Sequence, residues 1–191
     1  MASRWSWRRC PRSPPAPLVY PDESTEDLVL YSGTGEQLAE NRWSAHPLWS
    51  HTRLADFNSG LHGQPGRGSV AAVGTSTWST ARDLPTGAIE NSVTGRSIAW
   101  QVEHNGGWRW EVDDVRDGED SVAVVLLGPE DLDHHWSEEL SPGASFTTVP
   151  VSVAVAANGF EGVIAELTHH RRWLRRGAAP TAARFWCSTT T

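Results

Sequence analysis

Short apolar runs separated by turn residues are the main pattern of this chain from Asp27 to Ala157. The segments "DLVLYSG" and "GQPGRGSVAAVGTSTWS" have the composition of strands interrupted by Gly and Pro, and "SVAVVLLG" predicts a strand buried on both faces. In "SFTTVPVSVAVAA", Pro150 predicts an edge strand or a bulge. Regularly spaced short strands and turns predict an all-β fold, an antiparallel β-sandwich.

The clearest strand pattern surrounds the dipeptide Asn105-Gly106. Apolar residues take alternate positions on both sides of it: Ile98, Trp100 and Val102 before, then Trp108, Trp110 and Val112 after. Asn-Gly favours the tight turns of β-hairpins because both residues tolerate positive φ angles. The sequence therefore predicts a hairpin with indoles on one face, packed in or against the core.

The pattern changes to a helical one after residue 157. Asn158 is a suitable N-cap, and Glu161 lies three positions later, as in a capping box. One face carries Phe160, Val163, Ile164, Leu167 and Leu174, and the last turns carry Arg171, Arg172, Arg175 and Arg176. Cations are favoured at the C-terminal end of a helix dipole. The segment predicts one C-terminal amphipathic helix.

Four segments follow from these patterns. Residues 1–20 are rich in Pro and Arg and have no period, which predicts a disordered or unnatural N-terminal segment. Residues 21–157 are the predicted β-sandwich, and residues 158–176 are the predicted connecting helix. Residues 177–191 show neither strand nor helix periodicity and are expected to be unstructured.

Composition restricts the classes of function. The chain has 191 residues and a net charge of -7, which argues against nucleic-acid binding. The longest apolar run, Val122 to Leu127, is far shorter than the roughly 20 residues of a membrane-spanning helix. Cys10 and Cys187 lie at opposite ends, so no disulfide framework is predicted, and the N-terminus has no apolar run typical of a signal peptide. A cytoplasmic protein without membrane contact is expected.

Three segments carry a resemblance to a known family. They are "ENSVTGRSIAWQVEHNGGWRWEV", "WSEELSPGASFTTVPVSVAV" and "GFEGVIAELTHHRRWLRR". Between about Thr94 and Arg176, their order and spacing resemble the N-terminal domain of glycoside hydrolase family 36, the bacterial α-galactosidases. The match continues more weakly back to about Leu28. The resemblance implies a sandwich that is part of a larger supersandwich, followed by the helix that leads out of it.

The resemblance also implies a function. Family members hydrolyse terminal α-linked galactose from galacto-oligosaccharides such as raffinose or melibiose, with retention, using two Asp residues of a (β/α)8 barrel. No segment of this chain matches either catalytic Asp. The chain is therefore expected to be an inactive fragment of such an enzyme, without catalytic residues, metal or cofactor, whose intact parent is a homo-oligomer.

The tail "RFWCSTTT", residues 184–191, fits this expectation. The codons cgg ttc tgg tgt tca acg act aca tga encode it with a stop, and a shift of one base gives "PVLVFNDYM". That string is similar to the family's first barrel strand, "PVVFNDYMN". The tail is therefore expected to be barrel sequence translated out of frame, which the nucleotide sequence would test.

Acidic segments are the next candidates, because retaining glycosidases need two carboxyl groups about 5 to 5.5 Å apart. The acidic segments are "EVDD" (Glu111, Asp113, Asp114), "DGED" (Asp117, Glu119, Asp120), "PEDLD" (Glu130, Asp131, Asp133) and "SEEL" (Glu138, Glu139). Each lies in or beside a predicted turn, where Asp and Glu are ordinarily solvated. We expect none of them to be catalytic.

The remaining candidates also have structural interpretations. The neighbours His134-His135 and His169-His170 cannot converge on one ion from a strand or a helix, so no metal site is expected. The segment Gly63 to Ser69 lacks the Lys-Ser/Thr ending of a phosphate loop and is expected to be a turn. Trp78 could form a sugar platform but is expected to pack in or against the sheet.

Two other functions stay open at this point. The chain could be a stand-alone carbohydrate-binding sandwich, with exposed tryptophans stacking on sugar rings. It could also be a docking module that still recruits partner subunits, since the sandwich of the resembling family contributes to oligomers. A truncated sandwich would expose unpaired strand edges, which predicts poor solubility or aggregation.

Overall fold

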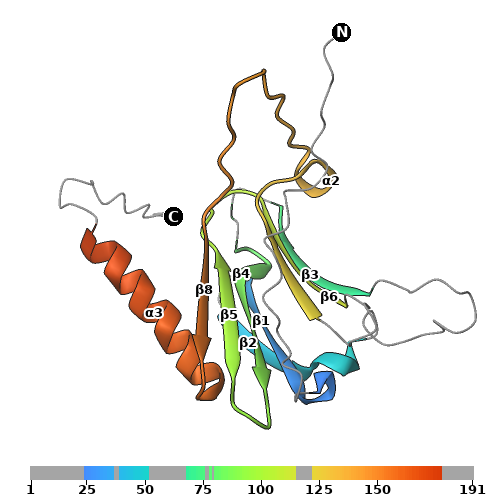
Figure 1. The fold of residues 1–191 in the computed structure, drawn as a ribbon, viewed down its shortest axis with the longest axis vertical. Coiled ribbons are helices and arrows are strands. Elements are labelled where there is room, and N and C mark those ends of the chain that lie inside the picture. The colour runs from blue at the N-terminus through green and yellow to red at the C-terminus, as the bar shows by residue number, and fades with distance from the viewer. Residues whose placement is uncertain are drawn as a thin grey trace, which may run out of the picture.

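The structure is a computed structural model that describes residues 24–36, 39–51, 68–75, 78, 80–114 and 122–177. Two antiparallel sheets and one long helix form it (Figure 1). The elements are η1 (Thr25–Asp27), β1 (Leu28–Glu36), β2 (Ala39–Pro47), η2 (Leu48–Ser50), β3 (Ser69–Gly74), β4 (Asp83–Asn91), β5 (Ser97–Val102), β6 (Trp108–Asp114), β7 (Val122–Leu127), α2 (Asp131–His134), β8 (Val151–Ala156) and α3 (Gly159–Gly177).

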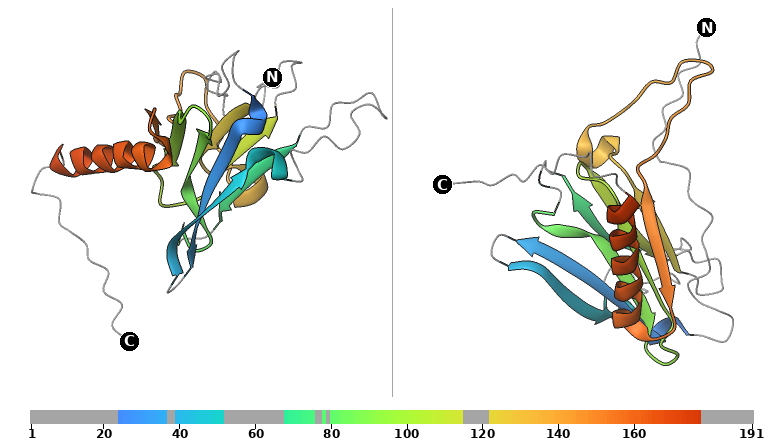
Figure 2. Two further views of the ribbon diagram at one scale, coloured as in Figure 1. Left: turned by 90° about the horizontal axis from the view of Figure 1, so that it is seen from below. Right: turned by 90° about the vertical axis from the view of Figure 1, so that its left-hand side faces the viewer.

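The larger sheet has the strand order β2-β1-β4-β5-β8, and the smaller sheet has the order β3-β6-β7. The smaller sheet packs on one face of the larger sheet, with β3 over β4 and β6 over β4 and β5. Helix α3 covers the opposite face, where it contacts β8, β5 and β4 (Figure 2). The predicted all-β antiparallel sandwich with one C-terminal helix is confirmed.

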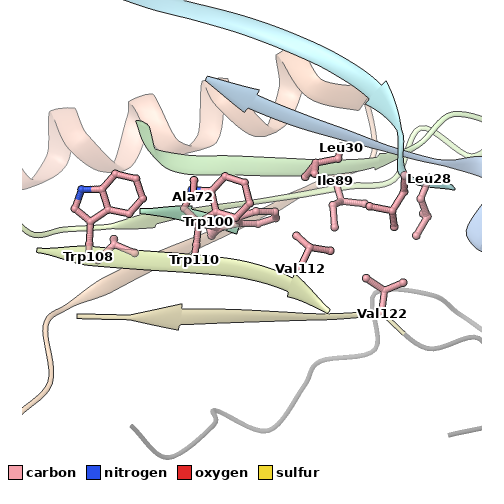
Figure 3. Packing of buried hydrophobic residues seen from close by; sticks show 11 residues of the cluster. Leu28, Leu30, Ala72, Ile89, Trp100, Trp108, Trp110, Val112 and Val122 are labelled. Atoms are coloured by element: carbon pink, nitrogen blue, oxygen red, sulfur yellow. The ribbon is translucent and has the colours of Figure 1, made fainter. Parts of the chain in front are cut away.

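The core between the sheets is built around three indoles. Trp100, Trp108 and Trp110 are all fully buried, as the alternation predicted. Figure 3 shows the β6 side chains pointing towards the larger sheet, where Trp110 meets Trp100 edge to face with ring centroids 5.5 Å apart. The Trp110 indole N–H donates to the Leu84 carbonyl at 3.1 Å, so its polar atom is satisfied inside the core.

The predicted hairpin around Asn105-Gly106 is wrong. Strand β5 pairs with β4 and β8, whereas β6 pairs with β3 and β7, so the two strands belong to different sheets. Five residues, Glu103 to Gly107, separate the strands, which is enough to cross the roughly 10 Å between packed sheets. The alternation correctly identified the buried face of each strand but did not identify its hydrogen-bonding partner.

Two other strand predictions have different outcomes. Strand β8 begins directly after Pro150 and is an edge strand of the larger sheet, as Pro150 predicted. The run "SVAVVLLG" was expected to be buried on both faces, but β7 is the edge of the smaller sheet. Only its ends, Val122 and Leu127, are buried, because no described strand covers its outer side.

Helix α3 begins and ends within one residue of the predicted limits. Val163 and Leu167 are buried, and Phe160 and Ile164 are partly buried against the sheet. Leu174, expected on the same face, is instead 41% exposed. Among the residues that the structure describes, no helix is long and apolar enough to cross a membrane.

Candidate functional site

The face of the larger sheet beneath α3 brings together the richest set of polar and titratable side chains. The residues of this face that lie under the helix are small: Ala88 and Ala99 are fully buried against Val163 and Leu167. Without bulky side chains on the sheet, the helix approaches it closely. The first half of α3 is therefore held by apolar packing, and polar groups gather at its two ends.

At the start of α3, Glu90 of β4 links the helix to the sheet. Its Oε2 accepts hydrogen bonds from the Tyr31 hydroxyl at 2.9 Å and from the Phe160 backbone N–H at 3.0 Å. The second bond satisfies one of the first-turn amides that a helix leaves without an internal partner. A carboxylate at this position also interacts favourably with the helix dipole. Glu90 thus caps the helix from the sheet.

Tyr31 completes this contact. Its ring stacks on Phe160 with centroids 4.1 Å apart and planes 8° apart. Burial, the hydrogen bond to Glu90 and the charge of Glu90 together raise the pKa of the Tyr31 hydroxyl to about 12. The phenol is neutral and acts as a donor across the physiological pH range. The predicted capping box between Asn158 and Glu161 stays a prediction.

Towards the end of α3, Glu103, Ser152 and His170 meet. His170 Nε2 lies 2.9 Å from the Ser152 hydroxyl and 3.1 Å from Glu103 Oε1, and the Ser152 hydroxyl donates to the same Oε1. The three residues come from the end of β5, from β8 and from the helix. A serine, a histidine and a carboxylate in mutual contact raise the question of nucleophilic catalysis.

The geometry is not that of a catalytic triad. In a triad, the carboxylate orients the histidine through Nδ1, which leaves Nε2 free to remove the proton from the nucleophile. Here Glu103 and Ser152 contact the same nitrogen, so the carboxylate competes for the group that would act as the base. The hydroxyl proton already points to a carboxylate. The cluster instead joins the helix to two strands.

Arg171 adds a second polar link beside this cluster. Its guanidinium donates from Nε to Gln101 Oε1 at 2.7 Å, with a further bond to the same oxygen from Nη2. Burial lowers the pKa of Arg171, and the nearby Glu103 carboxylate opposes that shift. Because His170 is bonded towards β8 and Arg171 towards β5, the rotation of the helix about its axis is determined.

A second polar cluster lies around Arg109 on the outer face of the smaller sheet. Arg109 Nε lies 2.5 Å from Glu111, and its Nη1 lies 2.6 Å from Asp133. Glu130 is 4.0 Å away. Two acidic segments from the sequence analysis, "EVDD" and "PEDLD", are thus brought together. The first forms the last four residues of β6.

The carboxylates of this cluster differ in proton affinity. Burial and a hydrogen bond to Asp133 raise the pKa of Glu130, although Arg109 opposes the shift. For Asp133, burial is outweighed by hydrogen bonds from Glu130 and Arg109, so its pKa is lowered. Such a divided pair is the pattern of an acid and a base. However, the Arg109 guanidinium lies 2.6 Å from Asp133 and 4.0 Å from Glu130, so a cation of the protein itself is the shared partner of the two carboxyl groups.

His134 anchors the same cluster. Its Nδ1 accepts a hydrogen bond from the Glu130 backbone N–H at 3.1 Å, so Nε2 carries the proton and donates to the Gly74 carbonyl at 3.0 Å. This contact fastens the short turn α2 to the end of β3. His135 and His169 are exposed. Within the described ranges, no three His, Cys, Asp or Glu side chains are placed to hold a metal ion.

The tryptophans divide into buried and exposed groups. Trp78 is 53% exposed and lies in the connection between β3 and β4, so it is not packed inside the sandwich; that it packs against the sheet stays a prediction. Trp136 is also exposed. The centroids of the Trp136 and Phe146 rings are 5.4 Å apart, and the ring planes are tilted by 38°. The "DGED" segment and residues 63–67 of the Gly-rich segment lie outside the described residues.

Sequence reasoning missed the groups beneath α3. Glu90, Glu103 and Ser152 belong to strands with no catalytic motif, and their partners lie 18 to 70 positions away in the chain. The available signal was the presence of polar residues on strand faces opposite the buried indoles. Gln101 and Glu103, for example, alternate with Trp100 and Val102.

The fold and these clusters define a β-sandwich module with a helix docked on its outer face. In comparisons with known proteins, no protein-family model matches the chain. No curated protein matches it either.

Proposed function

We propose that this chain is a non-catalytic β-sandwich module of an α-galactosidase-type glycoside hydrolase, resembling the domain that precedes the catalytic barrel in family 36. One observation carries the proposal. In each described cluster, the carboxylate, histidine and serine groups bond to other groups of the protein. Each cluster thereby attaches a helix or a turn to a sheet. Such groups position elements of the fold.

The arrangement of the resembling segments supports the family attribution. They form, in order, β5 and β6, then the connection that follows α2 together with β8, and finally α3. The last of them is the helix that leads out of the sandwich in the family. In the intact cytoplasmic parent, galacto-oligosaccharides would bind to the barrel, whose two aspartates would supply the nucleophile and the acid/base. The module would act as a scaffold for that domain.

Hydrolysis of an aryl α-galactoside by the purified chain tests the proposal. We expect no turnover above the blank. The control is the Glu130→Gln variant. It removes from the Arg109 cluster the Glu130 carboxyl, whose pKa is raised. Turnover that disappears in Glu130→Gln would refute the non-catalytic assignment. Separately, the family attribution fails if the nucleotide sequence around codons 184–191 encodes no barrel strand in any frame.

Carbohydrate binding is the second candidate, because Trp136 and Phe146 form an exposed aromatic pair. Aromatic rings stack on the apolar faces of sugars, but the tilt between these rings prevents a flat platform. A titration of tryptophan fluorescence with galactose and raffinose distinguishes the candidates. A saturable shift at millimolar sugar that is lost in Trp136→Ala would favour binding, and an unchanged spectrum would favour the scaffold.

A further inference from the structure

We propose that the outer edge of β8 pairs with β8 of a second copy of this chain, forming a two-fold symmetric dimer. The proposal does not rest on the galactosidase assignment. It rests on the composition of β8, on the exposure of its valines and on the charges of α3. An edge strand presents backbone N–H and C=O groups that can pair with another strand.

The two edges of the larger sheet differ in protection. Edge strands are normally protected from pairing by charged residues, prolines or irregularities. Strand β2, at one edge, carries Arg42 and His46, ends at Pro47 and has an irregular register with β1. Strand β8, at the other edge, reads "VSVAVA", with no charge, no proline and no glycine. Of these two edges, the β8 edge has the features of a pairing surface.

The exposed side chains of β8 are those of its three valines. Val151, Val153 and Val155 are 43%, 56% and 63% exposed. Their partners in β5 are Val102, Trp100 and Ile98, so the valines lie on the core side of the sheet. Their exposure shows that the smaller sheet, whose edge strand on this side is β7, does not fully cover them.

The backbone of these valines also points outwards. The Glu103 N–H donates to the Pro150 carbonyl, which fixes the alternation of the antiparallel ladder. Residues at even positions of β8 then bond to β5, and the three valines direct their N–H and C=O groups to the outer edge, which pairs with no strand among the described residues. Pairing centred on Val153 would place Val151 opposite Val155 of the other copy and would form about six hydrogen bonds.

Helix α3 carries complementary features on the other face of the same edge. Its first half contains Glu161 and Glu166, whereas its last turns contain Arg172, Arg175 and Arg176. A two-fold axis perpendicular to the sheet would set the two helices antiparallel. The basic end of one helix would then lie beside the acidic end of the other, which is a favourable arrangement of charge.

Trp173 lies on the side of α3 that faces this edge. Its ring stacks on that of His170. Around the helix axis, Trp173 and Arg171 lie on opposite sides of His170, and Arg171 bonds to β5. The indole is 64% exposed. Paired strands lie about 4.8 Å apart, and α3 lies over β8 and β5 of its own copy. Pairing of the two β8 strands would therefore place the two helix axes roughly 10–14 Å apart. A large aromatic side chain from each copy would fill that gap.

The test compares the full chain with Val153→Lys by sedimentation velocity at about 1 to 100 µM. We expect a dimer for the unchanged chain and at least a tenfold higher dissociation constant for Val153→Lys. Leu132→Lys is the matched control, because Leu132 is an exposed apolar residue on α2; it should leave the dimer intact. Circular dichroism verifies that each variant is folded.

A crosslinking experiment keeps the proposal testable if Val153→Lys fails to fold. The two Val153 side chains would be cross-strand neighbours, with Cβ atoms about 4.5–5.5 Å apart. In a background with Cys10→Ser and Cys187→Ser, Val153→Cys should give covalent dimers with a short bismaleimide, and Leu132→Cys should not. A monomeric chain at about 100 µM, or association unaffected by position 153, would overturn the proposal.

Discussion

Replacing Glu90 by Gln tests the link between the sandwich and α3. The amide keeps nearly the same shape and an acceptor oxygen, so the variant removes the charge and leaves the packing in place. Two hydrogen bonds to a carboxylate become bonds to a neutral group, from the Tyr31 hydroxyl at 2.9 Å and the Phe160 amide at 3.0 Å. The favourable interaction with the helix dipole is lost as well.

The magnitude follows from these contacts. Hydrogen bonds to charged groups contribute about 1.5–3 kcal/mol and neutral ones about 0.5–1.5 kcal/mol. A charge at a helix end contributes about 0.3–1 kcal/mol. Because Glu90 is only partly buried, solvent screens part of this difference. We expect Glu90→Gln to lower the free energy of unfolding by about 1–2 kcal/mol, a decrease in Tm of about 3–6 °C.

Urea denaturation followed by tryptophan fluorescence measures this effect, since the core indoles are buried only in the folded chain. Glu139→Gln, at an exposed position, is the matched control and should change stability by less than about 0.5 kcal/mol. In a double-mutant cycle with Tyr31→Phe, the coupling should exceed about 0.5 kcal/mol. Equal stability of Glu90→Gln and the unchanged chain would refute the capping role of Glu90.

Three further predictions concern pH and packing. Because the pKa of Tyr31 is raised to about 12, its contribution to stability is complete below about pH 10 and is lost as the pH rises towards 12. Urea denaturation at about pH 9 and 11 should show this loss of stability. The Tyr31→Phe variant should lack this pH dependence, and the Tyr20→Phe variant should keep it. Gly87→Ala should destabilise the fold by about 1–3 kcal/mol in the same assay, because the added Cβ would lie 2.5 Å from Cζ2 of the buried Trp100; a neutral effect would contradict the tight packing. Arg109→Gln should lower the free energy of unfolding by about 3–5 kcal/mol at pH 7, because Glu111, Glu130 and Asp133 lose their shared cation, and the loss should shrink at acid pH as Glu130, whose pKa is raised, becomes protonated. A pH-independent loss would show that packing of the Arg109 stem dominates.

The sequence predicted the faces of the strands better than their partners. Alternation around Trp100 and Trp110 correctly placed both indoles in the core, because burial of large apolar groups dominates the choice of face. The same alternation fits a hairpin and a crossing between sheets equally well. Which one forms depends on β4 and β8, and pairing with these strands joins residues up to 59 positions apart. Such long-range competition leaves no local signal.

The polar clusters were less predictable for a related reason. "EVDD" and "PEDLD" are ordinary acidic segments in isolation, and their meeting requires Arg109 of β6 to face the turn α2. Likewise, Ser152 and His170 gain their roles only after α3 folds back along β8. The helix itself was predictable within one residue because its period and its terminal charges are local properties.

The two ends of α3 explain why a scaffold would use polar contacts at all. Apolar packing on small residues such as Ala88 and Ala99 fixes the distance between helix and sheet, but it tolerates sliding and rotation. Glu90 fixes the axial position of the helix by bonding to its first turn, and His170 and Arg171 fix its rotation by bonding to different strands. Hydrogen bonds have directional preferences that hydrophobic contacts lack. A helix held in this way can transmit the orientation of the sandwich to whatever it contacts, and for such a purpose the titratable groups need to be bonded rather than reactive.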